Sequence, residues 1–263
     1  MKIKILDLDD CKVRCSYSEQ LKNFENEFTY PLGDKSFYIR HGYQGVYDYF
    51  SFFDQLGEVH YMVIEDDADK VIGAGCAILR HLNGEKVWYL CDFKIIKSFR
   101  GKHILEKMLL KYFFKFYKKS QKMYFVNMSN KKDNGLINRV TGLFHLFPIK
   151  AVDLYFFEWT MKDFIADNLN FDDYIFLTNK NKKDIVIDDE IFDIYHVIDK
   201  HSYIDVDKFH VADLAKIKST DTLMYSSPMN DKVEQILKIK QPSTVGSFVS
   251  HRFKMKAYYS VEI

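Results

Sequence analysis

The middle of the sequence alternates apolar and polar positions in a pattern that predicts successive β-strands. Val59–Glu65 alternates and is rich in β-forming residues, a polar turn follows, and Val71–Leu79 is a second apolar run. A third run, Val87–Ile96, follows a short turn that contains Gly84. These three segments are predicted to pair as an antiparallel meander, because short polar turns connect them.

The periodicity changes from that of a strand to that of a helix after the meander. Apolar side chains recur at spacings of three and four from Leu105 to Phe116, and lysines occupy the opposite face. This pattern predicts a long helix that buries one face and exposes the other. The elements predicted next are a strand at Lys122–Met128, a shorter helix at about Asn134–His145 and a strand at Ala151–Met161.

The last hundred residues or so carry a less regular pattern of short segments. Its predicted elements are helices at Met161–Asn168, Val206–Lys216 and Asn230–Ile239, with strands at Asp173–Thr178, Ile185–Ile187, Ile191–Ile198 and Phe253–Val261. We therefore predict two domains, residues 1–162 and 163–263, of which the second is a smaller α+β domain of unknown role.

Composition and charge exclude several classes of protein. The chain is 47% hydrophobic and 16% aromatic, which rules out a disordered protein. Its net charge of +1 offers no overall field that would attract nucleic acid. No apolar run reaches the length of a membrane span, and no signal peptide is recognisable, so we expect a cytoplasmic protein. The four cysteines lack the paired spacing of a zinc site, and we expect no metal.

The junction between the third strand and the long helix is a candidate anion site. Arg100, Gly101 and Lys102 lie where the strand gives way to the helix. Unpaired backbone N–H groups and the positive end of the helix dipole meet at such a junction, and both favour phosphate or pyrophosphate. A solvated turn before a helix is the alternative interpretation of the same residues.

The order of elements and the stretch from Asp92 to Leu105 resemble the GNAT superfamily of N-acyltransferases. The resemblance covers roughly Phe37 to Met161. In that family an Arg/Gln-x-x-Gly-x-Gly/Ala loop binds the pyrophosphate of coenzyme A; Arg100 matches its first position, whereas His103 and Leu105 stand where the motif has small residues. The resemblance implies a mixed, mostly antiparallel sheet flanked by helices, and acetyl-CoA or another acyl-CoA as co-substrate.

The same resemblance implies roles for individual residues. Asp92 would act as the base that takes the amine proton, directly or through water. His145, seven residues after Asn138, stands where the family has a tyrosine that protonates the departing thiolate, and an imidazole titrates near neutral pH. The residues that would bind the cofactor are Phe93, Lys94 and Ile95 through backbone N–H groups, Arg100, Gly101, Lys102, His103, Ile104 and Leu105 in the loop, and Asn134 and Asn138 in the second helix.

Several interpretations remain open at this point. The first is transfer of an acetyl or other acyl group from coenzyme A to an amine. Because the two motif glycines and the tyrosine are replaced, a catalytically inactive fold that binds a ligand or partner is the alternative. A hydroxyl acceptor or a larger acyl group is a third possibility. Asp92 is equally suited to a structural salt bridge, His145 to a core position, and the aromatic run from Tyr43 to Phe53 to packing or to a pocket. The sequence does not specify the acceptor or the oligomeric state.

Overall fold

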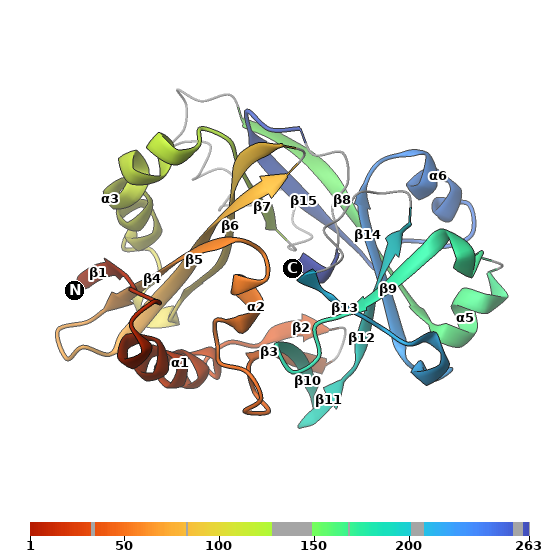
Figure 1. Ribbon diagram of the computed structural model, residues 1–263, viewed down its shortest axis with the longest axis horizontal. Coiled ribbons are helices and arrows are strands. Elements are labelled where there is room, and N and C mark those ends of the chain that lie inside the picture. Colours follow the sequence, from red (N-terminus) through yellow and green to blue (C-terminus); the bar gives the residue numbers. More distant parts are fainter. Residues whose placement is uncertain are drawn as a thin grey trace.

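The computed structural model describes residues 1–32, 35–82, 84–127, 149–167, 169–200, 208–254 and 260–262. In these ranges the chain forms a large mixed sheet, a small sheet and a few helices (Figure 1). The strands of the large sheet are, in spatial order, β1 (Lys2–Ile5), β4 (Glu58–Glu65), β5 (Val71–Leu82), β6 (Glu85–Ile95), β7 (Met123–Asn127), β15 (Thr244–His251), β8 (Ile149–Thr160), β14 (Thr222–Pro228), β12 (Ile194–Asp199), β9 (Tyr174–Thr178) and β13 (His210–Val211).

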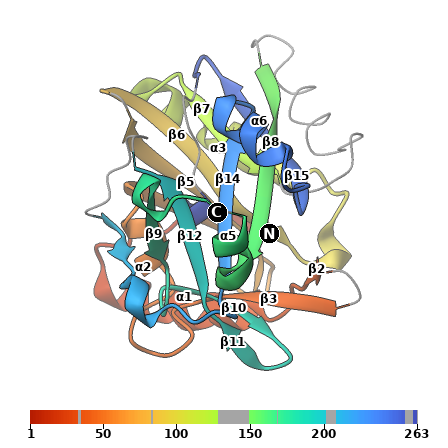
Figure 2. The ribbon, with the colours of Figure 1, turned by 90° about the vertical axis from the view of Figure 1, so that its right-hand side faces the viewer.

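The small sheet lies below the large one in the second view (Figure 2). Its strands are, in spatial order, β11 (Glu190–Phe192), β10 (Lys183–Ile187), β3 (Lys35–His41) and β2 (Tyr30–Leu32). The α-helices are α1 (Cys11–Glu25), α2 (Ser51–Asp54), α3 (Ile104–Lys119), α5 (Met161–Ala166) and α6 (Asp231–Leu237). Short 3-10 helices are Lys97–Phe99, Phe171–Asp173, Leu214–Lys216 and Ser260–Glu262. None of the helices in the described ranges has the length and apolar character needed to cross a membrane.

The predicted meander and long helix are confirmed. β4, β5 and β6 pair antiparallel in sequence order. Helix α3 buries Met108 and Phe116 against them, and its lysine face is exposed. The three strands and α3 form where the apolar periodicity predicts them, because the sheet and the helix bury their apolar faces against each other.

Two predicted elements near the C-terminal end are wrong. Where a helix was expected up to Lys216, the described residues form β13 and a 3-10 helix, because Asp213 caps the amide of Ala215 and closes a short turn. The last described strand is β15; of the predicted strand Phe253–Val261, the described residues 253–254 are not in a strand, and Ser260 and Val261 belong to a 3-10 helix. Thr244–His251 pairs with β7 on one edge and β8 on the other, and this double pairing fixes its position.

Residues on both sides of position 162 share the two sheets. β15 lies between β7 and β8, and β10 pairs with β3. The 260–262 segment contacts both regions: Arg80 Nη2 lies 2.5 Å from Glu262 Oε1, and Asn179 Nδ2 donates to the carbonyl of Val261 at 2.7 Å. The division into domains at residue 162 stays a prediction, and the strands from the second region bring its side chains to the centre of the molecule.

Candidate functional site

A bulge in β6 turns Asp92 away from the long helix. The pairing of β5 with β6 shifts its register between Ala74 and Cys76, and Asp92 has a left-handed φ of 55°. The ring of Phe93 lies 2.5 Å from where a Cβ on Gly75 would be, so glycine is needed for Phe93 to pack there. Phe93 packs with the cluster under α3. A bulge that re-aims a side chain in this way is common beside active sites.

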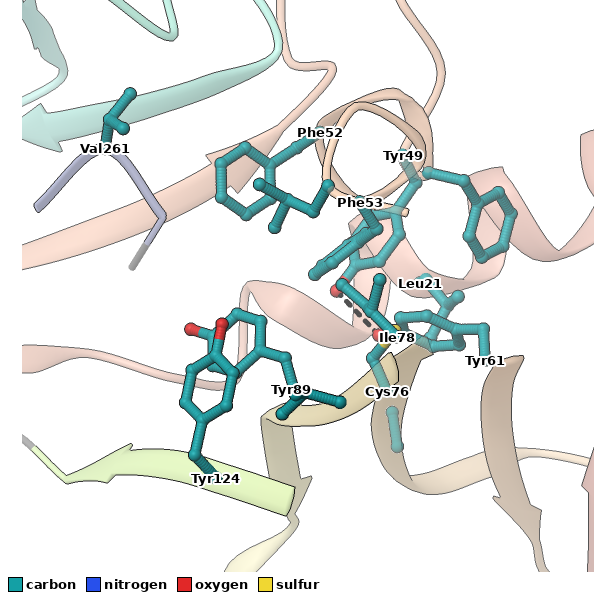
Figure 3. Close-up of a cluster of buried hydrophobic side chains, with 14 of the residues drawn as sticks. Leu21, Tyr49, Phe52, Phe53, Tyr61, Cys76, Ile78, Tyr89, Tyr124 and Val261 are labelled. Carbon is teal, nitrogen blue, oxygen red and sulfur yellow. Dashed lines mark hydrogen bonds between the residues drawn. The ribbon is translucent and has the colours of Figure 1, made fainter. Parts of the chain in front are cut away.

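Three donors hold the Asp92 carboxylate. Lys94 Nζ lies 2.6 Å from Oδ1, and the hydroxyls of Tyr61 and Tyr49 donate to Oδ2 at 2.5 and 3.0 Å. Both tyrosines are fully buried, their rings meet edge to face, and they lie in the cluster of Figure 3. Burial, followed by the charge of Asp92, raises the pKa of both phenols well above its usual value, so they remain donors.

Lys94 joins Asp92 to a second buried carboxylate, that of Glu25 at the end of α1. Lys94 Nζ lies 2.6 Å from Glu25 Oε1, and His41 holds Glu25 through Nδ1 at 2.8 Å and its backbone N–H at 2.9 Å. Burial opposes the charged form of each partner. The neighbouring opposite charges outweigh it: they raise the pKa of Lys94 and lower that of Glu25. The ion pair is therefore charged at neutral pH.

The pairing of β6 with β7 ends at Leu90, two residues before Asp92. β6 and β7 run parallel and pair only over Trp88–Leu90 with Met123–Phe125. From Cys91 to Ile95, no described strand pairs with β6 on the side that faces β7. The backbone of Phe93 to Ile95, which the resemblance assigns to the thioester oxygen, lies along this edge. Such an edge offers N–H and C=O groups to an extended ligand.

The predicted anion loop follows directly from this edge. Gly101 has a left-handed φ of 80° with nothing within 4 Å of the position that a Cβ would take, and His103 has the left-handed φ of 54° that glycine favours. The loop thus keeps a glycine-type conformation at His103 although the residue differs. His103 does not cap α3 with its side chain. Arg100, Lys102 and His103 are exposed, so they leave the N-terminus of α3 open to solvent.

Two loop side chains have other contacts. Arg100 Nε donates to the carbonyl of Ile95 at 3.0 Å, which braces the turn, and Lys102 Nζ lies 4.3 Å from the ring centroid of Phe99. Ile104 is buried under the helix, so only its backbone is available to a ligand. Leu105 lies in the first turn of α3, and its side chain is outside the described part of the structure.

Three predicted site residues are not described. His145, Asn134 and Asn138 lie outside the described residues, and their assigned roles stay predictions. Within the described ranges, sequence reasoning missed Glu25, His41 and the buried tyrosine pair. The packing interpretation of the aromatic run holds for Tyr49, Phe50, Phe52 and Phe53, which are buried, whereas Tyr43 and Tyr47 are exposed. No local spacing links Glu25 to Lys94, because they come from separate elements.

No protein-family model matches the sequence. An uncharacterised protein of Acanthamoeba polyphaga mimivirus, L340, is 25% identical over 207 residues, which are 72% of this chain and 59% of that protein. The chain thus spans about three fifths of that relative.

Among the solved structures to which the chain is similar are GNAT N-acetyltransferases. A tandem GNAT protein from the clavulanic acid biosynthesis pathway is 6% identical, with 97% of this chain and 99% of that chain covered and a TM-score of 0.48. The aminoglycoside 6'-N-acetyltransferase from Enterococcus faecium is 16% identical, with 59% and 88% covered and a TM-score of 0.35.

Proposed function

We propose that the chain transfers an acyl group from coenzyme A to an amine. The observation that carries this proposal is the parting of β6 from β7 next to Asp92, with a helix N-terminus at the end of the same strand. In this proposal an extended thioester arm lies along the edge of β6 that no described strand covers, with its diphosphate at the start of α3 and its thioester carbonyl near the bulge.

The transfer requires little beyond these groups. The amine nitrogen attacks the thioester carbonyl carbon, a C–N bond forms, and the C–S bond breaks as the thiolate leaves. Backbone N–H groups of Phe93 to Ile95 stabilise the negative charge on the carbonyl oxygen. Asp92 accepts the amine proton, directly or through water, while Tyr49 and Tyr61 hold its carboxylate in place. The proton for the thiolate is assigned to His145 by the resemblance alone.

Thermal unfolding with acetyl-CoA tests the binding step. A ligand at 100 times its dissociation constant stabilises the folded state by about 2.7 kcal/mol. Arg100→Glu should abolish this stabilisation, because it puts a carboxylate where the diphosphate binds. Lys118→Glu is the matched control, since it makes the same charge reversal at the exposed far end of α3. An unchanged stabilisation in Arg100→Glu would remove the loop from the cofactor site.

Release of free thiol from acetyl-CoA with a panel of amines tests the chemical step. Asp92→Asn should keep the stabilisation by acetyl-CoA and lower turnover by about 10²- to 10⁴-fold, the usual contribution of a general base. Full activity in Asp92→Asn would discard the assignment. The engagement of Asp92 by Lys94 and two tyrosines also suits a purely structural role. Stabilisation by acetyl-CoA without turnover on any amine would favour a ligand-binding module instead.

A further inference from the structure

Lys183 brings an amine from the second region to the buried network around Asp92. It begins β10 directly opposite His41 on β3, so the two side chains share one face of the small sheet. Its Nζ lies 4.8 Å from the ring centroid of Phe52, and the charges of Asp92 and Glu25 act on it. The region after residue 162 therefore contributes a cation to the site that Asp92 defines.

The carboxylates of this network already have their donors, whereas Lys183 has no counterion among the residues that the structure describes. Glu25 is held by Lys94 and His41, and Asp92 by Lys94 and two tyrosines. Among the described residues, the Lys183 amine has no ion pair or hydrogen bond, and its side chain is only half-buried. Burial lowers the pKa of Lys183 to about 8, and the like charge of Lys94 adds to this effect against the attraction of Asp92. The amine is thus mostly charged at pH 7 and lacks an anionic partner of its own among the described residues.

We propose that Lys183 binds the carboxylate of the acceptor while the amine of the same acceptor lies at Asp92, so that the acceptor is an amino acid or a closely related aminocarboxylate. This inference rests on the proposed acyl transfer. The buried network contains two carboxylates, Glu25 and Asp92, and two lysine amines, Lys94 and Lys183, so its charges balance. A zwitterion keeps this balance and supplies the single negative charge that Lys183 lacks, whereas a dianion such as phosphate adds an uncompensated charge to a buried site.

The titratable and charged groups that face Lys183 come from four elements. They are Cys91, Asp92 and Lys94 on β6, Glu25 on α1, His41 on β3 and His196 on β12. His196 has a strongly lowered pKa, through burial and then the charge of Lys183, and remains neutral. A carboxylate bound to Lys183 puts a negative charge beside its amine and favours the charged form, so it raises the pKa of Lys183.

The test uses the reaction product as a probe and needs no coenzyme A. The protein is labelled with ¹³Cε-lysine, and its pH titration is followed by NMR without ligand and then with N-acetyl-L-alanine, with its carboxamide or with inorganic phosphate. The Lys183 signal is assigned by its loss in Lys183→Met. Without ligand, the midpoint should lie near pH 8. N-acetyl-L-alanine should raise the pKa of Lys183 by about one unit, which means that it binds the protein with the charged amine tenfold more tightly than the protein with the neutral amine. The carboxamide should not move it, and phosphate should move it less than the acid.

Lys180→Met is the matched control, because Lys180 lies on the preceding turn, paired with Asp193 and half exposed. It should keep the response of Lys183 to N-acetyl-L-alanine. If Lys183→Met does not fold, Lys183→Arg assigns the signal equally well. No shift with N-acetyl-L-alanine, an equal shift with its carboxamide or a larger shift with phosphate would overturn the proposal. Loss of stabilisation by acetyl-CoA would instead overturn the proposed function, so the two failures are distinct.

Discussion

Replacing Lys94 with methionine tests how strongly the buried network depends on its central cation. Lys94 is 5% exposed, and its Nζ lies 2.6 Å from both Glu25 and Asp92. Lys94→Met leaves two buried carboxylates without their shared cation, and such a loss typically costs about 3–5 kcal/mol. We expect about 3 kcal/mol, since His41 still donates to Glu25 and the tyrosine pair to Asp92.

Urea unfolding followed by tryptophan fluorescence measures this loss as a midpoint shift of about 1 M or more. Lys86→Met is the control, because Lys86 is exposed on the same strand, and it should change stability by no more than about 0.5 kcal/mol. Adding Glu25→Gln to Lys94→Met should recover part of the loss, since it removes one uncompensated charge. The reasoning fails if Lys94→Met costs less than about 1 kcal/mol, or if Glu25→Gln destabilises that variant further.

Two further predictions concern single side chains. Burial lowers the pKa of His196 to about 3, so below about pH 6.5 the unfolded chain binds one proton more than the folded chain. His196 alone therefore lowers the free energy of unfolding by about 1.4 kcal/mol for each pH unit between pH 6 and pH 4. His196→Gln should flatten the pH dependence of urea unfolding by that amount, and an unchanged slope would contradict a neutral His196. His103→Gly should relieve the left-handed φ at position 103 and raise the free energy of unfolding by up to about 1 kcal/mol, whereas Gly101→Ala should lower it by about 1 kcal/mol. If urea unfolding showed that both variants change the free energy of unfolding in the same direction, the strain at His103 would be contradicted.

The sequence predicts elements whose pattern is local, and it fails where partners are distant. The meander and α3 follow from apolar periodicity within single segments. Helix α1 was not predicted, because few of its side chains, such as Leu21 and Phe24, are apolar and buried. The position of β15 depends on β7 and β8, which lie far away in the sequence.

The site follows the same rule. Asp92 was identified through its place before the loop, but the buried partners Glu25 and Lys183 were not. A charged residue in a polar stretch has the same pattern whether it is solvated or buried. Only the tertiary arrangement decides between the two: it brings Glu25 of α1 to Lys94 of β6 and places Lys183 of β10 opposite His41 of β3, and the spacing within any one segment does not encode it.

Stability alone does not explain a core that contains these charges. Buried ion pairs are often replaced by apolar residues of similar size without loss, because desolvation offsets most of their attraction. Here the acids come from α1 and β6 and the lysines from β6 and β10, so three elements each bury a charge at one place. The network also holds Asp92 at a bulge with an unfavourable φ. A strained and charged cluster beside the edge of β6 that no described strand covers supports the proposed binding of a polar substrate better than a role in packing.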